Sequence, residues 1–127
     1  MKHENTLTRA LPGSGATTDF TGDWTNELKS IAHLNQSGNV LSGTYESKVS
    51  STGDTTAGDL CGYVDGDLIS FVVRWRDFQA ITAWVGQLRA GASVQTFDTL
   101  WQMTTQVAAG DEWASINAGA DTFTRQS

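Results

Sequence analysis

Hydrophobic and polar side chains alternate along most of the chain after Phe20, and a period of two residues is typical of β-strands with one buried face. The alternation is clearest in four segments, which are 40–49 (VLSGTYESKV), 68–75 (LISFVVRW), 80–88 (AITAWVGQL) and 99–105 (TLWQMTT). Because successive side chains of a strand point to opposite faces, each segment is predicted to turn one face toward a core and the other toward solvent.

Turn-forming residues separate these segments, at 35–39 (NQSGN), 64–67 (VDGD) and 89–92 (RAGA). The pair Asp65-Gly66 is the strongest of these signals, because Asp-Gly favours a two-residue hairpin. The chain has no amphipathic helical segment that could cross over between parallel strands. We therefore predict an all-β fold of seven or eight antiparallel strands, closed as an eight-stranded up-and-down β-barrel. The interior of such a barrel has room for side chains or for one small ligand.

Two stretches lack the alternating pattern. Residues 1–19 contain PGSG and many polar residues, and we predict a flexible tail there, followed by one barrel domain at 20–127. Within the tail, TLTRALP at 6–12 could form a single helical turn. The stretch AAGDEWASINAG at 108–119 is predicted to be a non-strand connection with a short helical turn that Asp111 starts.

Length and charge narrow the class of function. A chain of 127 residues fits one domain, and its net charge of −6 argues against binding to nucleic acid or to an anionic membrane surface. Its longest apolar runs, such as 68–73, are too short to cross a bilayer. The N-terminal stretch has no continuous apolar region of the kind found in signal peptides. We expect either a mature product or a protein that stays inside the cell.

Cysteine and histidine are scarce. Cys61 is the only cysteine, so an intrachain disulfide is impossible, and we expect it to be a small buried apolar residue. His3 and His33 are the only histidines and lie far apart in the sequence, so no metal site is predicted.

The segment WTNELKS at 24–30 places polar side chains where burial is expected. If it is one strand, Asn26 and Ser30 share the inward face with Trp24 and Leu28. A buried amide or hydroxyl without a partner costs about 1–3 kcal/mol, so these groups should have partners inside the barrel. Inward positions elsewhere add more polar and aromatic side chains, namely Tyr45, Ser47, Thr82, Trp75, Trp84 and Trp101. This combination favours a small-molecule pocket, although a tryptophan-rich core whose polar groups bond to each other would give the same pattern.

Several short motifs occur in a specific order: GTYESKV at 43–49, VRW at 73–75, TAW at 82–84, LWQM at 100–103, the isolated Trp113, and ADTF at 120–123. Each is weak alone, but their order and spacing resemble the avidin/streptavidin family from about Phe20 to Arg125. The resemblance implies a barrel that binds biotin non-covalently and with high affinity in its interior. It also implies a homotetramer, a secreted location, no enzymatic activity and no cofactor, with biotin as the ligand.

The resemblance further implies a role for each polar position. Asn26, Ser30 and Tyr45 correspond to the three donors to the ureido carbonyl oxygen of biotin. Ser47 and Asp121 correspond to the acceptors for the two ureido N–H groups, a role that suits a carboxylate because charged acceptors form stronger hydrogen bonds.

The remaining positions correspond to the walls and the mouth of the pocket. Thr82 matches the hydroxyl that meets the ring sulfur, and Trp113 matches the residue that closes the pocket of a neighbouring subunit. The walls correspond to Trp75, Trp84 and Trp101, with Leu28, Val49 and Met103 as smaller pieces. Ala80 stands where the family usually carries a serine hydroxyl for the carboxylate of the ligand.

Other functions stay open on the sequence alone. Catalysis has little support, because a serine nucleophile needs a partnered base and His33 lies outside any matching motif. Ala80 and the loop at 50–59, with its own length and two acids, leave room for a scaffolding oligomer with weakened biotin binding. A related barrel for another small ring compound is the nearest alternative. The family includes dimers as well as tetramers.

Overall fold

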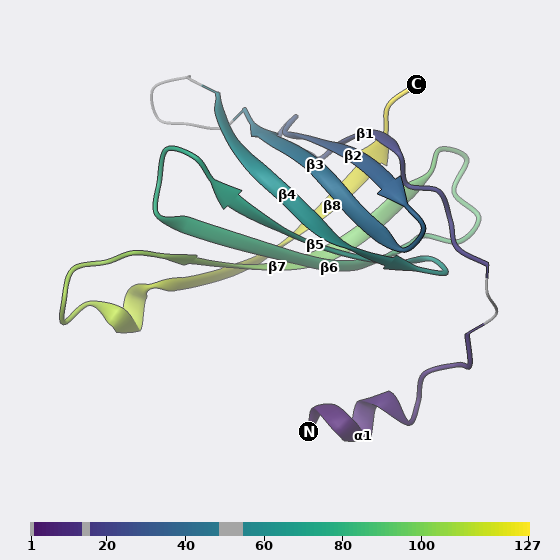
Figure 1. The fold of residues 1–127 in the computed structure, drawn as a ribbon, viewed down its shortest axis with the longest axis horizontal. Helices are drawn as coiled ribbons and strands as arrows, with labels where there is room; N and C mark the ends of the chain where they lie inside the picture. Colours follow the sequence, from purple (N-terminus) through teal and green to yellow (C-terminus); the bar gives the residue numbers. More distant parts are fainter. Residues whose placement is uncertain (1, 14–15, 49–54) are drawn as a thin grey trace.

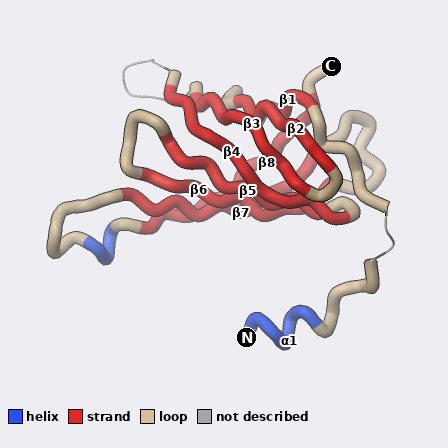
Figure 2. The backbone as a smooth tube through the Cα atoms, viewed as in Figure 1, coloured by secondary structure: helices blue, strands red, loops and turns tan. Residues whose placement is uncertain are grey.

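The computed structural model describes residues 2–13, 16–48 and 55–127. Eight antiparallel strands form one closed barrel, in which each strand pairs with its sequence neighbours and the last returns to the first (Figures 1 and 2). The strands are β1 (Gly22–Thr25), β2 (Ile31–Ser37), β3 (Val40–Ser47), β4 (Thr56–Asp65), β5 (Leu68–Trp75), β6 (Ala80–Leu88), β7 (Thr96–Thr105) and β8 (Ile116–Arg125). The predicted all-β, eight-stranded up-and-down barrel is confirmed.

Alternation along each strand determines which side chains fill the barrel. In β3, Leu41 is buried between the exposed Val40 and Ser42, and in β5 the buried Ile69, Phe71 and Val73 alternate with the exposed Leu68, Val72 and Arg74. The inward faces predicted from the period of two are therefore correct for these strands.

One end of the barrel is filled by aromatic rings. The rings of Trp24 and Phe97 lie 4.8 Å apart between centroids, and those of Phe97 and Phe123 stack at 5.0 Å. The guanidinium of Arg125 lies 4.4 Å from the centroid of the Trp24 ring and donates to the carbonyls of Thr21 and Asp19. This packing fills one end of the barrel with side chains, and we call the other end the open end.

The open end carries the β1–β2 connection, the β5–β6 connection and the β7–β8 connection (Figure 1). A short 3-10 helix, η1 (Glu112–Ala114), interrupts the last of these. The helical turn predicted within 108–119 is thus present, but Asp111 makes no side-chain cap bond, and β8 already begins at Ile116. Residues 116–119, which were expected to be a connection, are strand because they pair with β7.

The segment 24–30 is not one strand, which corrects the prediction. β1 ends at Thr25, and the Asn26 side chain then accepts hydrogen bonds from the backbone N–H groups of Leu28 (3.1 Å) and Ser30 (3.0 Å). Lys29 has a φ of 64°, in the left-handed region. A side chain that bonds its own backbone in this way forms a turn, and alternation no longer applies. Leu28 is therefore 60% exposed rather than inward.

Two other local predictions also need correction. The two-residue hairpin loop is Gly66–Asp67, because Asp65 pairs with Leu68, and the positive φ of 56° falls on Gly66. β4 begins at Thr56, so the last part of the predicted loop at 50–59 is strand.

Cys61 is exposed, although burial was expected. The inward residues of β4 are the even-numbered ones, such as Leu60 and Val64, so Cys61 faces outward. Its apolar character is shared by Val72, the residue opposite it on β5.

The N-terminal tail is partly structured. A short helix, α1 (His3–Leu7), lies earlier than the predicted turn at 6–12 and buries no side chain. Thr18 donates from its backbone N–H to the Gly66 carbonyl (2.9 Å) and from its hydroxyl to Asp67 (2.6 Å). The part of the tail at 16–19 is thus attached to the β4–β5 turn.

Candidate ligand-binding site

Three polar side chains from two elements meet inside the open end. The turn at 26–30 holds Asn26, whose Nδ2 lies 3.2 Å from the hydroxyl oxygen of Tyr45 on β3. Ser30 is buried, and its Oγ accepts a hydrogen bond of 3.2 Å from the backbone N–H of Lys48. Ser30 also hydrogen-bonds the Tyr45 hydroxyl, so the structure brings together Asn26, Ser30 and Tyr45, the three predicted donors.

The Tyr45 hydroxyl is held in its neutral, donating form. Burial raises its pKa far above the ordinary value, and the negative charge of Asp121 raises it further. At neutral pH this group can donate a hydrogen bond but cannot become a phenolate.

A carboxylate lies next to these donors, within hydrogen-bonding reach of Asn26. Asp121 on β8 is half-buried, and its Oδ2 accepts a hydrogen bond of 2.9 Å from the indole N–H of Trp84 on β6. Burial raises the pKa of Asp121, the Trp84 hydrogen bond lowers it, and the charge of Glu27 raises it again, with a net increase. Glu27 is nearby because its carboxylate accepts from the backbone N–H of Thr122 (2.9 Å).

Aromatic rings connect the two polar groups. Tyr45 stacks on Trp84 with a centroid distance of 4.9 Å, and Phe71 stacks on Trp84 at 5.0 Å. Trp75 meets Tyr45 edge-on at 5.6 Å and donates its indole N–H to the hydroxyl of Thr82 (3.0 Å). Trp101 on β7 is half-buried and packs directly against the backbone of Gly119, where an added Cβ would lie 2.5 Å from its ring.

Every buried polar side-chain atom among the described residues has a hydrogen-bond partner. Asn26, Tyr45, Ser30 and Asp121 are thus satisfied by protein groups, which is the alternative that the sequence left open. A ligand that entered would need to offer these groups hydrogen bonds at least as good as those they already make.

A cavity of about 510 Å³ lies at the open end, and we call it the mouth cavity. Its lining residues are Ser47, Thr56, Trp75, Phe78, Gln79, Ala80, Met103, Thr105 and Gln106. Ser47, Ala80 and Met103 were predicted site residues, and each lies two positions from another one on its strand, namely Tyr45, Thr82 and Trp101. Because residues two apart share a face, the walls of the mouth cavity continue inward to the polar groups.

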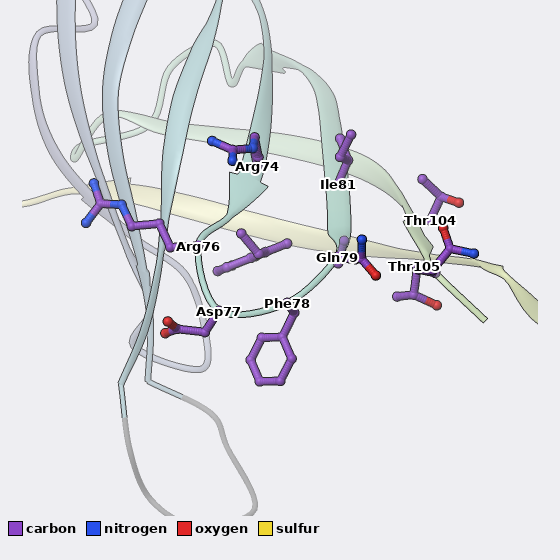
Figure 3. A pocket seen from close by; sticks show the side chains of 11 residues that line it. Arg74, Arg76, Asp77, Phe78, Gln79, Ile81, Thr104 and Thr105 are labelled. Atoms are coloured by element: carbon purple, nitrogen blue, oxygen red, sulfur yellow. The ribbon is translucent and has the colours of Figure 1, made fainter. Parts of the chain in front are cut away.

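A second cavity of about 530 Å³, the rim cavity, lies at the β5–β6 connection (Figure 3). Its lining residues are Arg74, Trp75, Arg76, Asp77, Phe78, Gln79, Ala80, Ile81, Thr104, Thr105 and Gln106. It shares six of these with the mouth cavity, so the two spaces are adjacent across the 76–79 connection.

Three predicted site residues are not part of this arrangement. Leu28 is exposed on the turn, and Trp113 on η1 is 85% exposed and packs on no part of its own barrel core. Val49 lies outside the described residues, as does the part of the 50–59 loop up to residue 54.

The structure also adds residues that the sequence analysis did not single out. Phe78, Gln79 and Gln106 line both cavities from connections, and Phe71 stacks on Trp84. Phe71 could have been found from its inward position in β5, whereas the connection residues follow no period that the sequence reveals.

No group of three or more His, Cys, Asp or Glu side chains suited to a metal occurs within 2–13, 16–48 and 55–127. Across the same ranges, the helices are all too short or too polar to span a lipid bilayer.

A family model matches nearly the whole chain. The sequence model of the Avidin family matches residues 14–126. The chain belongs to the avidin family. The match starts before Phe20 and so includes the tail residues that bond to the β4–β5 turn.

The avidin-like barrel also agrees with a solved structure. A crystal structure of Xenavidin superposes with a TM-score of 0.75 at 28% sequence identity, covering 87% of this chain and all of the other. At this level of identity the avidin fold is retained while many side chains differ, so the roles of individual residues in this family member have to be argued from its own geometry.

Proposed function

We propose that the protein binds biotin, one molecule per chain, in the interior of the barrel. The observation that carries this proposal is the group of polar side chains that meet inside the open end of the barrel. Donors from Asn26, Ser30 and Tyr45 lie close together, and the Asp121 carboxylate beside them is an acceptor. A ureido ring has one carbonyl acceptor and two N–H donors, and it therefore needs this combination of partners.

The interior chemistry favours a neutral, planar ligand. Tyr45 remains a protonated donor at neutral pH, and its fixed hydroxyl, together with Asn26 and Ser30, provides preorganised donors for a carbonyl oxygen. Ser47 would accept from the second ureido N–H, and Thr82, two positions from Ala80 on β6, would meet the ring sulfur. The rings of Trp75, Trp84 and Trp101 supply the apolar walls that such a ring system requires.

The protein would act as a binder and not as an enzyme. Binding needs no cofactor in this proposal, and family membership supports both this role and a secreted location. His33, the histidine of the barrel domain, lies on the outer surface and bonds Asp23 and Glu46 there. It is therefore not available as a base for Ser30 or Ser47.

The proposed assembly is a homotetramer. Apolar side chains are exposed on the outer face of β6, β7 and β8, where Val85 pairs with Leu100 and Leu100 pairs with Ala120. Leu100 is 70% exposed and Trp113 is 85% exposed. Adjacent exposed apolar residues of this kind mark interaction surfaces. Trp113 would reach into the mouth cavity of a neighbouring subunit, since its own barrel offers the indole no packing surface.

Tryptophan fluorescence and thermal unfolding with added biotin test the proposal directly. Binding should quench Trp75, Trp84 or Trp101 and raise the melting temperature by mass action. Desthiobiotin, which keeps the ureido ring but lacks the sulfur, is the matched control and should also raise it, by less. An unchanged melting temperature at millimolar biotin would show that the barrel has another function.

A further inference from the structure

The peptide unit that follows Asp121 is held at both ends by side chains. Its carbonyl oxygen, on Asp121, accepts a hydrogen bond of 2.9 Å from the hydroxyl of Thr99, which is buried on β7. Its N–H, on Thr122, donates to the two carboxylate oxygens of Glu27, at 2.9 and 3.1 Å. The backbone beside Asp121 is thus fixed from two directions, while the indole of Trp84 holds the carboxylate itself.

Glu27 takes the place of a strand that has ended. β1 and β8 pair as far as Thr25 and Thr124, and this register, if continued, would set residue 27 opposite Thr122. β1 ends at Thr25, and the chain then enters the turn. A backbone N–H that loses the carbonyl of its neighbouring strand needs another acceptor. The side chain of Glu27 supplies this acceptor at the position where the ladder stops.

The turn at 26–30 is bonded to both neighbouring sides of the barrel. Its internal hydrogen bonds fix its shape, but its place depends on its contacts with other strands. Toward β3, the amide of Asn26 reaches the Tyr45 hydroxyl at 3.2 Å. Toward β8, Asn26 hydrogen-bonds the Asp121 carboxylate, and Glu27 bonds the next residue of that strand. Glu27 therefore determines how the turn is seated against β8.

We propose that Glu27 is a positioning residue for the ligand: its carboxylate anchors the turn to β8 and so holds Asn26 and Asp121 at the spacing of one ureido group. This inference rests on the proposed function and adds a residue to it. Glu27 is exposed and would not touch the ligand. Its effect would reach the ligand through Asn26, its neighbour in the chain, and through the peptide unit that Asp121 shares with Thr122.

The same carboxylate adds a negative charge next to Asp121, and this charge raises the pKa of Asp121. The other groups that face the Asp121 carboxylate are neutral, namely the indole of Trp84 and the amide of Asn26. The Tyr45 hydroxyl also stays neutral, because burial raises its pKa far above the ordinary value. Glu27 should therefore raise the pH at which the site loses its ligand on acidification.

Two variants separate the acceptor oxygen of Glu27 from its charge. Glu27→Gln keeps an oxygen that can accept from the Thr122 N–H, whereas Glu27→Ala removes the acceptor. Biotin methyl ester is the probe, because it keeps the ureido ring and carries no charge, so that only the protein titrates. In calorimetric titration at about pH 8, where carboxylates are ionised, Glu27→Ala should bind the ester about tenfold more weakly than the wild type. Glu27→Gln should lose less, since the hydrogen bond is weakened but kept.

The pH profile gives a readout that a merely structural side chain would not move. The titration is repeated between about pH 8 and about pH 4, the range in which carboxyl groups become protonated. Both variants should lose affinity at a lower pH than the wild type, because Asp121 ionises more readily without the charge of Glu27.

Asp98→Asn is the matched control. The Asp98 carboxylate accepts from the hydroxyl of the same Thr122 (2.9 Å), but it is exposed and its charge is paired with Arg89 at 2.7 Å. This variant removes one carboxylate charge beside the same residue of β8. It should leave both the affinity for the ester and the pH profile as in the wild type.

The results separate this inference from the proposed function. If Glu27→Ala binds the ester as tightly as the wild type, the inference is wrong while biotin binding stands. A pH profile that is the same in Glu27→Gln and in the wild type also overturns it. If the wild type binds neither biotin nor its ester, the proposed function fails and the inference fails with it.

Discussion

At the scale of single residues, Asp121 combines burial with a role that requires charge. Burial raises its pKa above the ordinary value of 3.8, so it becomes protonated at a higher pH than a surface aspartate. The protonated form loses one acceptor site for a ureido N–H. Biotin affinity should therefore decrease as the pH falls through this raised pKa.

The effect of Asp121 on stability has the opposite sign. A carboxyl with a raised pKa binds its proton more tightly in the folded chain than in the unfolded chain, so protonation of this group favours the folded state. Protonation of Asp121 at acid pH should therefore weaken biotin binding without itself unfolding the chain.

Asp121→Asn should weaken biotin about 10- to 100-fold, because a hydrogen bond to a charged group contributes about 1.5–3 kcal/mol. The circular dichroism of the barrel should not change. Asp98→Asn is the matched control, since it removes a similar charge from an exposed ion pair with Arg89. If titration gave both variants the same biotin affinity, Asp121 would have a structural role only.

Ala80 is the second residue whose chemistry can be tested alone. It lines the mouth cavity, and a serine there would add the hydroxyl that this cavity lacks at β6. Ala80→Ser should tighten free biotin by about tenfold, with a smaller gain for biotin methyl ester, which has no charge. Ala83→Ser, on the opposite face of the same strand, should change neither affinity. Equal gains for acid and ester would show that the hydroxyl acts elsewhere.

At the scale of elements, three neighbouring strands are joined on the outer surface by His33. Its Nδ1 lies 2.7 Å from Asp23 on β1 and its Nε2 lies 3.2 Å from Glu46 on β3, while Lys48 bonds the other oxygen of Glu46. Burial alone would lower the pKa of His33, but the hydrogen bonds and charges of Asp23 and Glu46 raise it overall. Ser30 directly precedes β2 and Tyr45 lies on β3, so the contacts of His33 hold together the strands next to the site.

The pH dependence of this contact follows from the raised pKa. The stabilisation is fully present below the unfolded pKa of about 6.5 and is lost as the pH rises through the higher folded pKa. His33→Gln should lower stability at about pH 5.5 by no more than about 1 kcal/mol, the range of exposed pairs, and have almost no effect at about pH 9. Urea unfolding at both pH values measures this, with His3→Gln on α1 as the control. A deficit of equal size at both pH values would contradict the ion-pair account.

The elements also show how far the sequence leads. β5 and β6 begin and end where the period of two predicts, because their inward side chains fill a continuous core. The sequence did not reveal the turn at 26–30, because Asn26, Leu28 and Ser30 are spaced two residues apart, as in a strand. In the structure, the Asn26 side chain instead bonds the backbone N–H groups of Leu28 and Ser30. The predicted polar residues still meet, since the turn and β3 both end at the open side of the barrel. Gln79 and Gln106 could not be predicted, because their proximity depends on which connections meet across the mouth.

At the scale of the whole molecule, Trp113 links binding to assembly. An indole that is 85% exposed on η1 leaves a large apolar area in water, and burying a tryptophan removes about 150–250 Å². If this ring enters a neighbour's mouth cavity, the assembled form binds biotin more tightly, and by reciprocity biotin strengthens assembly.

Trp113→Lys should therefore lower biotin affinity at least about tenfold and shift the chain toward smaller assemblies, with the monomer fold intact. Val94→Lys, another exposed apolar residue but at the closed end, should do neither. Sedimentation of both variants and the wild type, with and without biotin, measures the change. The account is contradicted if the Trp113→Lys variant keeps the molar mass of the wild-type assembly and if biotin leaves wild-type assembly unchanged. Trp113 would then lie outside any shared pocket.

The central claim is that the polar groups at the base of the mouth cavity hold a ureido carbonyl, and one hydroxyl tests it most directly. Tyr45→Phe removes only the oxygen that lies 3.2 Å from Asn26 and keeps the ring that stacks on Trp84. Calorimetric titration with biotin should give one site per chain in the wild type and an affinity lower by about tenfold or more in the variant. A variant that binds biotin as tightly as the wild type, or a wild type that gives no heat of binding, would contradict the account.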